Sequence, residues 1–290
     1  MTATVIISTY KNPVALRRCL LGFAVQTRTD FDVFVIDDGS GPETKDVLED
    51  PQLCSLNMRY LWHADKGFRK NLLLNRAIAL CESDYLIFCD GDCIPRDDFV
   101  ANHLRFARPQ HYVSGTRVEV PETTHRHFSD HDICSGRVFD PDYLCRQDRC
   151  LSRFRWRMGR HPWQMKVGDL LTTRFFVFHG SNAGAWREDL LRINGFDEQL
   201  TWGSDDRDVG ARLKNVGVGS VFKKFSLVQL HLGHGRGWAD PVRSAQNRAT
   251  FKARLWMMDR TVRANPGVAT ALDRSDGYEL QTIAGNEFAA

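Results

Sequence analysis

The strongest constraint on the fold is an alternation of short apolar runs and amphipathic segments in the first third of the chain. The apolar, strand-like runs are residues 4–8, 31–36, 60–62 and 85–89. Between them, helical spacing of apolar residues begins after Asn12-Pro13 and recurs over 71–81. Such alternation predicts an α/β fold, in which helices cover a mostly parallel sheet.

Polar residues directly follow several of these strands. Thr9 and Tyr10 follow the first strand, Asp37 and Asp38 the second, and Asp90-Gly91-Asp92 the fourth. Because ligands of open α/β sheets bind beyond the carboxyl ends of the strands, these residues are expected to share one edge. Two carboxylates on a short turn suit Mg²⁺ or Mn²⁺, which keep positions open for phosphate oxygens. Asp-Gly-Asp is also common in plain turns, so a purely structural reading stays open.

The second half of the chain is less regular. From about Pro121 to Lys166 it is rich in Arg, His and Asp, and this stretch is interpreted as an insertion of loops and helices that faces a partner. Four elements are expected after it: a strand at 175–178 and helices at 187–193, 205–216 and 240–263. From Ala264 onward the chain is expected to be weakly ordered.

Two later segments add candidate site residues. Asp205 and Asp206 stand at the start of a predicted helix, where the helix dipole favours charged carboxylates, although simple capping would also explain them. His231 and His234 stand near the end of a short strand. Two imidazoles flanked by small residues are better candidates for metal ligands than a lone histidine.

Composition and charge exclude several classes of protein. The 39 Lys and Arg against 36 Asp and Glu give a net charge of +3, which is too balanced for wholesale nucleic-acid binding. No run approaches the roughly 18 apolar residues of a membrane-spanning helix. The first residues enter a strand pattern instead of a signal peptide, so a cytoplasmic protein is expected. The eight cysteines show no C-x-x-C pair and are expected to be reduced.

Motifs spread along the chain resemble a known family. They are residues 5–12, 35–40, 85–92, 180–184, 194–198 and 202–213. In this order they resemble glycosyltransferase family 2 with the Rossmann-like GT-A fold, and the later motifs resemble its galactosyltransferase-like branch. The resemblance covers roughly positions 3 to 235. It implies a GT-A domain over 1–240, with a nucleotide-sugar-binding half (1–118), a basic insertion (119–174) and an acceptor and catalytic half (175–240), followed by a C-terminal helix and tail (241–290).

The resemblance also implies an activity. Members of the family use a divalent cation, here Mn²⁺ or Mg²⁺, and usually invert the anomeric carbon of a nucleoside-diphosphate sugar. The expected reaction moves a hexosyl or N-acetylhexosaminyl group, from a UDP-sugar in the first instance, to a hydroxyl of a glycan or lipid-linked acceptor, as in polysaccharide biosynthesis. Such a transfer needs a carboxylate to take the acceptor proton and a cation to neutralise the leaving diphosphate.

The same resemblance assigns roles to individual residues. Asp206 is the expected base, and Asp205 orients the acceptor. The expected metal ligands are Asp92, His231 and Asp90, with His234 as the alternative to His231. The expected donor contacts are Thr9, Tyr10, Asp38, Arg69, Asp90 and Gly91, with Lys70 beside Arg69 as a second candidate for the diphosphate. The expected acceptor contacts are Trp202, Gly203 and Asn182.

The insertion is both basic and aromatic. Between Arg146 and Lys166, arginines alternate with aromatic residues and Asp148 is the only acid, and the final helix repeats this pattern. Two interpretations have equal weight. One is contact with an anionic membrane surface at the inner face of the membrane. The other is an Arg-rich lid whose arginines pair with Asp130, Asp132, Asp140 and Asp142.

Two further classes of function stay open. A catalytically silent sugar-nucleotide or glycan-binding protein of the same fold would have little need of Asp206, so the presence of this acid favours catalysis. Nucleic-acid binding through the insertion ranks third, because the acids at the strand ends would repel phosphates without a cation. No nucleic-acid partner is therefore expected.

Overall fold

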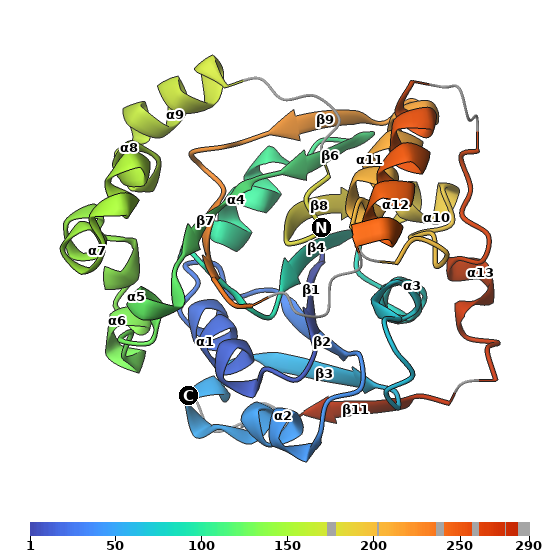
Figure 1. The fold of residues 1–290 in the computed structure, drawn as a ribbon, viewed down its shortest axis with the longest axis horizontal. Coiled ribbons are helices and arrows are strands. Elements are labelled where there is room, and N and C mark those ends of the chain that lie inside the picture. The colour runs from blue at the N-terminus through green and yellow to red at the C-terminus, as the bar shows by residue number, and fades with distance from the viewer. Residues whose placement is uncertain (173–177, 202, 236–240, 257–260, 276, 284–290) are drawn as a thin grey trace.

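A mixed sheet of eight strands forms the centre of the protein in a computed structural model, which describes residues 1–172, 178–201, 203–235, 241–256, 261–275 and 277–283. From edge to edge the order is β11 (Glu279–Ile283), β3 (Asn57–Trp62), β2 (Asp32–Asp37), β1 (Ala3–Thr9), β4 (Tyr85–Asp90), β8 (Asn182–Trp186), β6 (His111–Ser114) and β9 (Gly219–Phe222). Strands β1 to β4 are parallel to one another. The predicted α/β sheet is thus confirmed (Figure 1).

The parallel half is apolar on both faces because a helix covers each of them. Val5 and Ile7 of β1 point into the core under α1 (Pro13–Ala24), whereas Ile6 packs on the other side with α3 (Lys70–Leu80). Helix α1 begins as predicted, with Asn12 Oδ1 accepting from the Ala15 amide at 3.2 Å. This packing fixes the carboxyl ends of the four strands at one edge.

A second sheet has three strands: β5 (Cys93–Pro95), β10 (Val228–Leu232) and β7 (Thr116–Val120). Strand β10 lies in the middle, antiparallel to β5 and parallel to β7. Its register places His231 opposite Cys93 on one side and Glu119 on the other. The small sheet therefore joins the turn after β4 to residues that are more than a hundred positions away in the chain.

Five further helices belong to the body of the domain, and three of them correspond to helices predicted from the sequence. They are α2 (Pro42–Asp46), α4 (Phe99–Phe106), α10 (Arg187–Arg192), α11 (Asp205–Asn215) and α12 (Pro241–Leu255). The predicted helices at 187–193 and 205–216 are confirmed as α10 and α11. Helix α12 ends before Arg263, and Arg254 near its end is buried in ion pairs with Asp197 and Asp208 instead of adding to a basic surface. The predicted strand at 175–178 lies, apart from Phe178, outside the described residues.

The expectation of a weakly ordered chain after Ala264 is wrong for most of that segment. Helix α13 (Val268–Ala271) packs on α3, and Arg76 Nε donates to the Ala271 carbonyl at 3.0 Å. Strand β11 then pairs antiparallel with β3 and covers that edge of the sheet. These contacts join distant parts of the chain, which is why the local sequence pattern did not indicate them.

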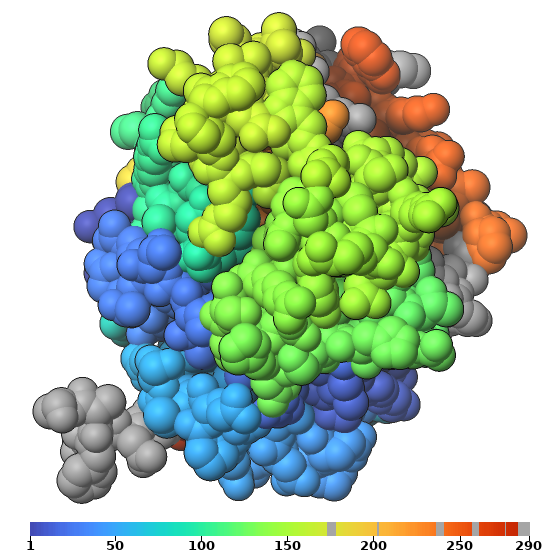
Figure 2. Space-filling view, turned by 90° about the vertical axis from the view of Figure 1, so that its left-hand side faces the viewer, coloured from blue at the N-terminus to red at the C-terminus, as the bar shows by residue number. Residues whose placement is uncertain are grey.

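The insertion consists of loops and short helices, as predicted: α5 (Glu122–His125), α6 (Asp130–Cys134), α7 (Pro141–Gln147), α8 (Arg155–Met158) and α9 (Pro162–Leu171). Figure 2 shows that these helices, in green and yellow-green, form a continuous layer over one side of the molecule. Of the four acids named for a lid, Asp132 and Asp142 pair with arginines of the insertion, Arg137 and Arg155, whereas Asp130 pairs with Arg17 of α1. Asp140 instead caps α7.

Candidate active site

The small sheet brings three possible metal ligands together. Ligand atoms of Asp92, His231 and His234 all lie within 4.8 Å of one another. Asp92 Oδ2 is 3.3 Å from His231 Nε2 and 2.9 Å from His234 Nε2. Asp92 directly precedes β5, so the pairing of β5 with β10 holds its carboxylate against His231.

Both imidazoles are oriented by a second contact. His231 Nδ1 lies 3.1 Å from Glu119 Oε2, in ion-pair range although not aligned as a hydrogen bond, and His234 Nδ1 lies 2.9 Å from the Gly235 carbonyl oxygen. Without a cation, Nε2 of each ring is the atom that donates to Asp92. An oxygen beside Nδ1 can hold the ring proton on that nitrogen once Nε2 binds a metal, which is the usual arrangement of metal-binding histidines. Nε2 of each ring then faces Asp92. One carboxylate and two imidazoles form a donor set that suits Mn²⁺, so these residues fit the implied cation.

The protonation state of Asp92 also suits a ligand. Burial would raise the pKa of Asp92, but hydrogen bonds and charge from His231 and His234 outweigh burial and hold this pKa below its usual range. The carboxylate is therefore an anion at neutral pH, as metal binding requires.

Lys70, at the start of α3, connects the strand ends with the start of α11. Its Nζ donates to Asp90 Oδ1 at 2.6 Å, and Asp90 Oδ1 also accepts from Ser8 Oγ at 2.9 Å. Burial would lower the pKa of Lys70, but the negative charges of Asp90, Asp205 and Asp206 outweigh burial and raise it. Lys70 is thus a permanent cation among three acids. Asp90, which was expected to be a metal ligand, is hydrogen-bonded to Lys70. Among the described residues, it is not one of the side chains whose ligand atoms gather with that of Asp92.

Asp205 and Asp206 occupy the first turn of α11. Asp206 Oδ2 accepts from the Gly180 amide at 3.0 Å, and its Oδ1 accepts from the Arg207 amide at 2.7 Å. Burial, together with the charge of Asp206, raises the pKa of Asp205 to about 7, although Lys70 opposes this shift. The turn at 90–92 and the start of α11 therefore belong to one electrostatic cluster.

Asp38, an expected donor contact, is engaged by the protein itself. Its Oδ1 lies 2.7 Å from His63 Nε2, and its Oδ2 accepts from the Arg69 amide at 2.9 Å. The Asp38 amide in turn donates to the Thr9 carbonyl at 3.1 Å. Through these contacts, Thr9 and Asp38 help to fix the loop that precedes α3. His63 is not among the residues expected from the sequence, although its position directly after β3, at the same edge of the sheet, could have indicated it.

Tyr10 and Gly91 lie at the same edge. Tyr10 is exposed, and its hydroxyl donates to Asp65 Oδ2 at 3.0 Å. The Gly91 amide donates to the Ser8 carbonyl at 2.7 Å, and a Cβ at position 91 would lie only 3.1 Å from that oxygen. Gly91 therefore allows the ends of β1 and β4 to approach closely.

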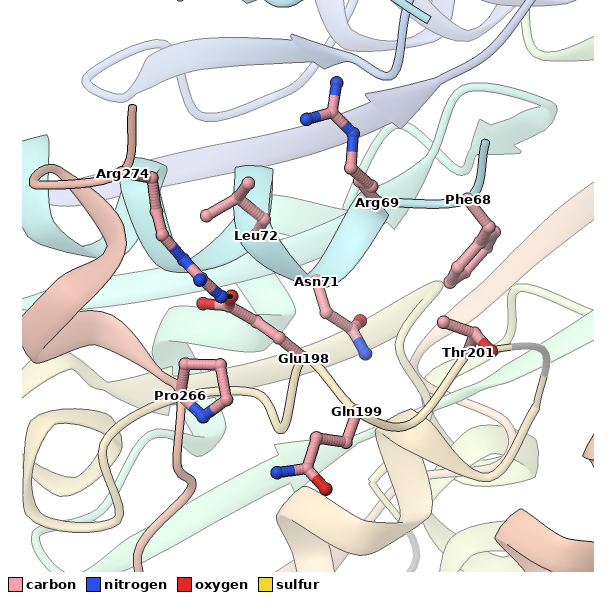
Figure 3. A pocket seen from close by; sticks show the side chains of 9 residues that line it. All are labelled: Phe68, Arg69, Asn71, Leu72, Glu198, Gln199, Thr201, Pro266 and Arg274. Carbon is pink, nitrogen blue, oxygen red and sulfur yellow. Dashed lines mark hydrogen bonds and ion pairs between the residues drawn. The ribbon is translucent and has the colours of Figure 1, made fainter. Parts of the chain in front are cut away.

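Arg69 lines two cavities beside α3. The first, of about 280 Å³, also has walls from Phe68, Asn71, Leu72, Glu198, Gln199, Thr201, Pro266 and Arg274, and Figure 3 shows Arg274 reaching toward Glu198. Arg274 donates to Glu198 Oε2 at 2.7 Å. The second, of about 320 Å³, is walled by Trp62, Ala64, Lys66, Gly277, Tyr278 and Glu279. The C-terminal segment thus contributes walls to both cavities, which no local motif indicated.

The expected acceptor contacts lie in different environments. The Asn182 amide is buried, and its Nδ2 donates to the carbonyls of Thr116 at 2.9 Å and Leu227 at 3.2 Å. Asn182 therefore ties the two sheets together and lies in the framework. Gly203 is exposed with φ of +89°, directly before α11. Trp202 lies outside the described residues.

Comparisons with known proteins show that the chain matches two family models. The family model described as glycosyl transferase family 2 matches residues 4–189, and that described as the N-terminal domain of galactosyltransferase matches residues 174–231. The chain is 28% identical over 233 residues to validoxylamine A glucosyltransferase of Streptomyces hygroscopicus subsp. jinggangensis (strain 5008), covering 74% of this chain and 52% of that protein. It is 23% identical over 231 residues to hyaluronan synthase of Pasteurella multocida, covering 76% of this chain and 23% of that protein. The chain thus aligns with about half, or less, of these relatives' length.

Solved structures show the same fold at low identity. A mannosyltransferase from Pyrobaculum calidifontis, PcManGT, in complex with GDP-Man and Mn²⁺, has a TM-score of 0.55 and 20% identity, covering 93% of this chain and 74% of that one. GalNAc-T7 with UDP, GalNAc and Mn²⁺ has a TM-score of 0.60 and 12% identity, covering 95% and 56%. The predicted GT-A fold is confirmed by this likeness. Because the first family model covers well over half of its length, the chain belongs to glycosyl transferase family 2, and residues 174–231 also resemble the galactosyltransferase domain.

Proposed function

We propose that this chain is a metal-dependent, inverting glycosyltransferase that moves a sugar from a nucleoside-diphosphate sugar to a hydroxyl of a glycan or lipid-linked acceptor. One observation carries the proposal. Lys70 joins Asp90, at the strand end, to Asp205 and Asp206 on α11, while Asp92, two residues on, meets His231 and His234. A candidate cation site and a candidate base thus belong to the same strand-end region.

The donor and the cation are proposed partly from the relatives. The structural neighbours were solved with GDP-Man and Mn²⁺ and with UDP, GalNAc and Mn²⁺. These complexes support a nucleoside-diphosphate sugar with Mn²⁺ or Mg²⁺, and we take a UDP-hexose or UDP-N-acetylhexosamine as the first candidate. Thr9, Tyr10, Asp38, Arg69, Asp90 and Gly91 remain the proposed donor contacts.

Asp92, His231 and His234 are the residues that would hold the cation. When bound, the cation supplies positive charge to the departing diphosphate. Glu119 Oε2 lies beside Nδ1 of His231, while Nε2 of the same ring faces Asp92. The positive charge of Lys70 reduces the repulsion between Asp90 and the two acids of α11, so that these side chains can lie close together.

Asp206 is the proposed base. Two backbone amides, those of Gly180 and Arg207, hold its carboxylate in one orientation, so it can take the proton from an acceptor hydroxyl as the hydroxyl attacks. Direct attack by the acceptor in a single displacement inverts the anomeric carbon. Asp205, with its pKa near 7, is partly protonated at neutral pH and can donate a hydrogen bond that orients the acceptor. Trp202 and Gly203 remain proposed acceptor contacts beside it.

A screen of nucleoside-diphosphate sugars tests this function. The protein is heated with each sugar nucleotide in the presence of Mn²⁺, Mg²⁺ or a chelator, and the best binder is then assayed for hydrolysis and transfer. We expect one sugar nucleotide to raise the melting temperature only with the cation and to be turned over. Binding without any turnover would favour a catalytically silent protein, and no cation-dependent binding would contradict the proposal.

A further inference from the structure

Helix α9 is the last helix of the insertion, and its polar contacts lie on the face that packs against the rest of the domain. Asp169 is buried, and its carboxylate accepts from the Phe225 amide at 2.7 Å and from Ser226 Oγ at 2.6 Å. Gly168 packs so closely on the Phe225 ring that a Cβ there would come within 2.5 Å of it. Buried hydrogen bonds and close packing therefore fix the inner face of α9 to the domain.

The outer face of α9 is apolar. Trp163, Val167, Leu170 and Leu171 are 59, 39, 77 and 73% exposed, and we call these four residues the α9 stripe. Their spacing of i, i+4, i+7 and i+8 places them on one face of the helix. A surface helix ordinarily turns such a stripe toward the core. An outward stripe on a helix that is already anchored therefore indicates a surface that contacts something else.

Basic and aromatic residues accompany the stripe. Trp156 of α8 is 49% exposed, and its carbonyl accepts from Gln164 of α9 at 3.2 Å. Arg149, Arg153 and Lys166 are exposed and make no ion pair within the described ranges of the chain. Figure 2 shows the helices α8 and α9 on the same side of the molecule. The insertion therefore combines exposed apolar side chains with three basic side chains, those of Arg149, Arg153 and Lys166, that have no ion pair among the described residues.

We propose that the α9 stripe docks this domain on an anionic lipid surface. The inference rests on the proposed function, because a lipid-linked acceptor would be held at such a surface. With 10 residues, α9 is too short to cross a bilayer but suits a helix that lies in the interface, with apolar side chains among the acyl chains and Arg and Lys at the headgroups. None of the helices within the described residues has the length and apolar character to span a membrane.

Charge favours lipid over another protein copy as the occupant. In a two-fold symmetric dimer through the stripe, the basic residues of one copy would face those of the other, and like charges in contact are unfavourable. An anionic membrane surface instead attracts each basic side chain near it. The charges beside the stripe thus complement phosphate headgroups.

Flotation of vesicles tests the proposal without any need for turnover. The full chain is mixed, in chelator and without nucleotide, with vesicles of phosphatidylcholine alone or of phosphatidylcholine with phosphatidylglycerol. We expect flotation with the anionic vesicles, and about tenfold less partitioning for the double variant Leu170→Ser/Leu171→Ser. The matched control is Val14→Ser/Leu272→Ser, which also removes two exposed apolar side chains but outside the insertion, and it should float like the unchanged protein.

Two results would overturn the inference. The first is no flotation of the unchanged protein with anionic vesicles at low salt. The second is equal flotation of Leu170→Ser/Leu171→Ser. If this variant instead converts a dimer to a monomer in light scattering while the unchanged protein does not float, the stripe is an interface between copies. The same variant should bind and turn over the donor normally. If neither the unchanged protein nor the variants bind or turn over a donor, the proposed function is contradicted, whereas the docking result still stands.

Discussion

At the scale of single residues, the candidate site depends on a balance between one lysine and three acids. Lys70 is hydrogen-bonded to Asp90 and interacts electrostatically with Asp205 and Asp206. Acids brought this close would otherwise repel one another or take up protons. The position of Lys70 at the first residue of α3 explains how acidic residues from two distant segments can lie close to one another.

Replacing Lys70 tests this balance. Lys70→Met should lower the free energy of unfolding by about 2 kcal/mol, because Asp90 loses its partner in a partly buried position. Urea denaturation followed by circular dichroism measures the change. Lys70→Arg keeps the charge and should recover at least half of the loss. Equal stability of Lys70→Met and the unchanged protein would show that the three acids do not need this cation.

Asp206→Asn separates binding from chemistry. An amide cannot accept the acceptor proton as a base, so transfer should fall by about a thousandfold. The thermal shift produced by the donor should persist, because Asp206 is proposed to act on the acceptor. Asp273→Asn, which changes an exposed acid outside the site, is the control. Normal transfer by Asp206→Asn would show that another group is the base.

Asp205 makes the free energy of unfolding of the protein depend on pH. The pKa of this carboxyl is about 7 in the folded protein and near 3.8 without the fold, so the folded state holds the proton more tightly. Its effect on folding is therefore small at pH 4 and increasingly unfavourable as the pH rises to about 7.

Asp205→Asn should remove this cost. The gain in unfolding free energy over the unchanged protein should grow by about 3 kcal/mol between pH 4.5 and pH 8, because each pH unit over which only the folded state holds the proton costs about 1.4 kcal/mol. Urea denaturation measures this growth. The exposed control Asp273→Asn should show no such growth. A gain that is the same at both pH values would mean that Asp205 is not proton-linked to folding.

At the scale of elements, the helix that carries both α11 acids is held by α12. Arg254 of α12 pairs with Asp208 at 2.7 Å and with Asp197 at 3.0 Å, and Asp208 also accepts from Arg212 at 2.7 Å. All of these groups are buried. The second half of the site is therefore fixed by a buried charge network instead of by apolar packing alone.

Removal of Arg254 should be costly for the same reason. Arg254→Met leaves two buried carboxylates with one cation fewer, so the unfolding free energy should fall by about 3 kcal/mol. Arg248→Met, at an exposed position of the same helix, should change it by less than about 0.5 kcal/mol. Calorimetric or urea unfolding compares the two variants. Similar small effects for both would mean that α12 is not fixed through Arg254.

The sequence predicted the elements whose stability is local. The runs at 5–7 and 85–89 are apolar throughout because helices cover both faces of the sheet. Asn12 caps α1, as its position directly before Pro13 predicts. The meeting of Asp92 with His231 was expected from a family resemblance, since it depends on the register between β5 and β10. The burial of Asn182 and the pairing of β11 with β3 depend on distant partners, which a local pattern does not contain.

At the scale of the whole molecule, two structural units meet at the candidate site. The parallel sheet contributes Asp90 and the contact between Asp38 and His63, and the three-stranded sheet contributes His231. The insertion covers one side of the domain, and the C-terminal segment lines cavities beside α3. The turn from Asp90 to Asp92 therefore joins the two sheets at the candidate site.

The most direct test of this account is the number of Mn²⁺ ions bound per chain, measured by electron paramagnetic resonance with UDP present. We predict one tightly bound ion in the unchanged protein and loss of this ion in Asp92→Asn, with Asp206→Asn retaining it. Mn²⁺ bound equally well by Asp92→Asn, or no bound Mn²⁺ in the unchanged protein, would contradict it.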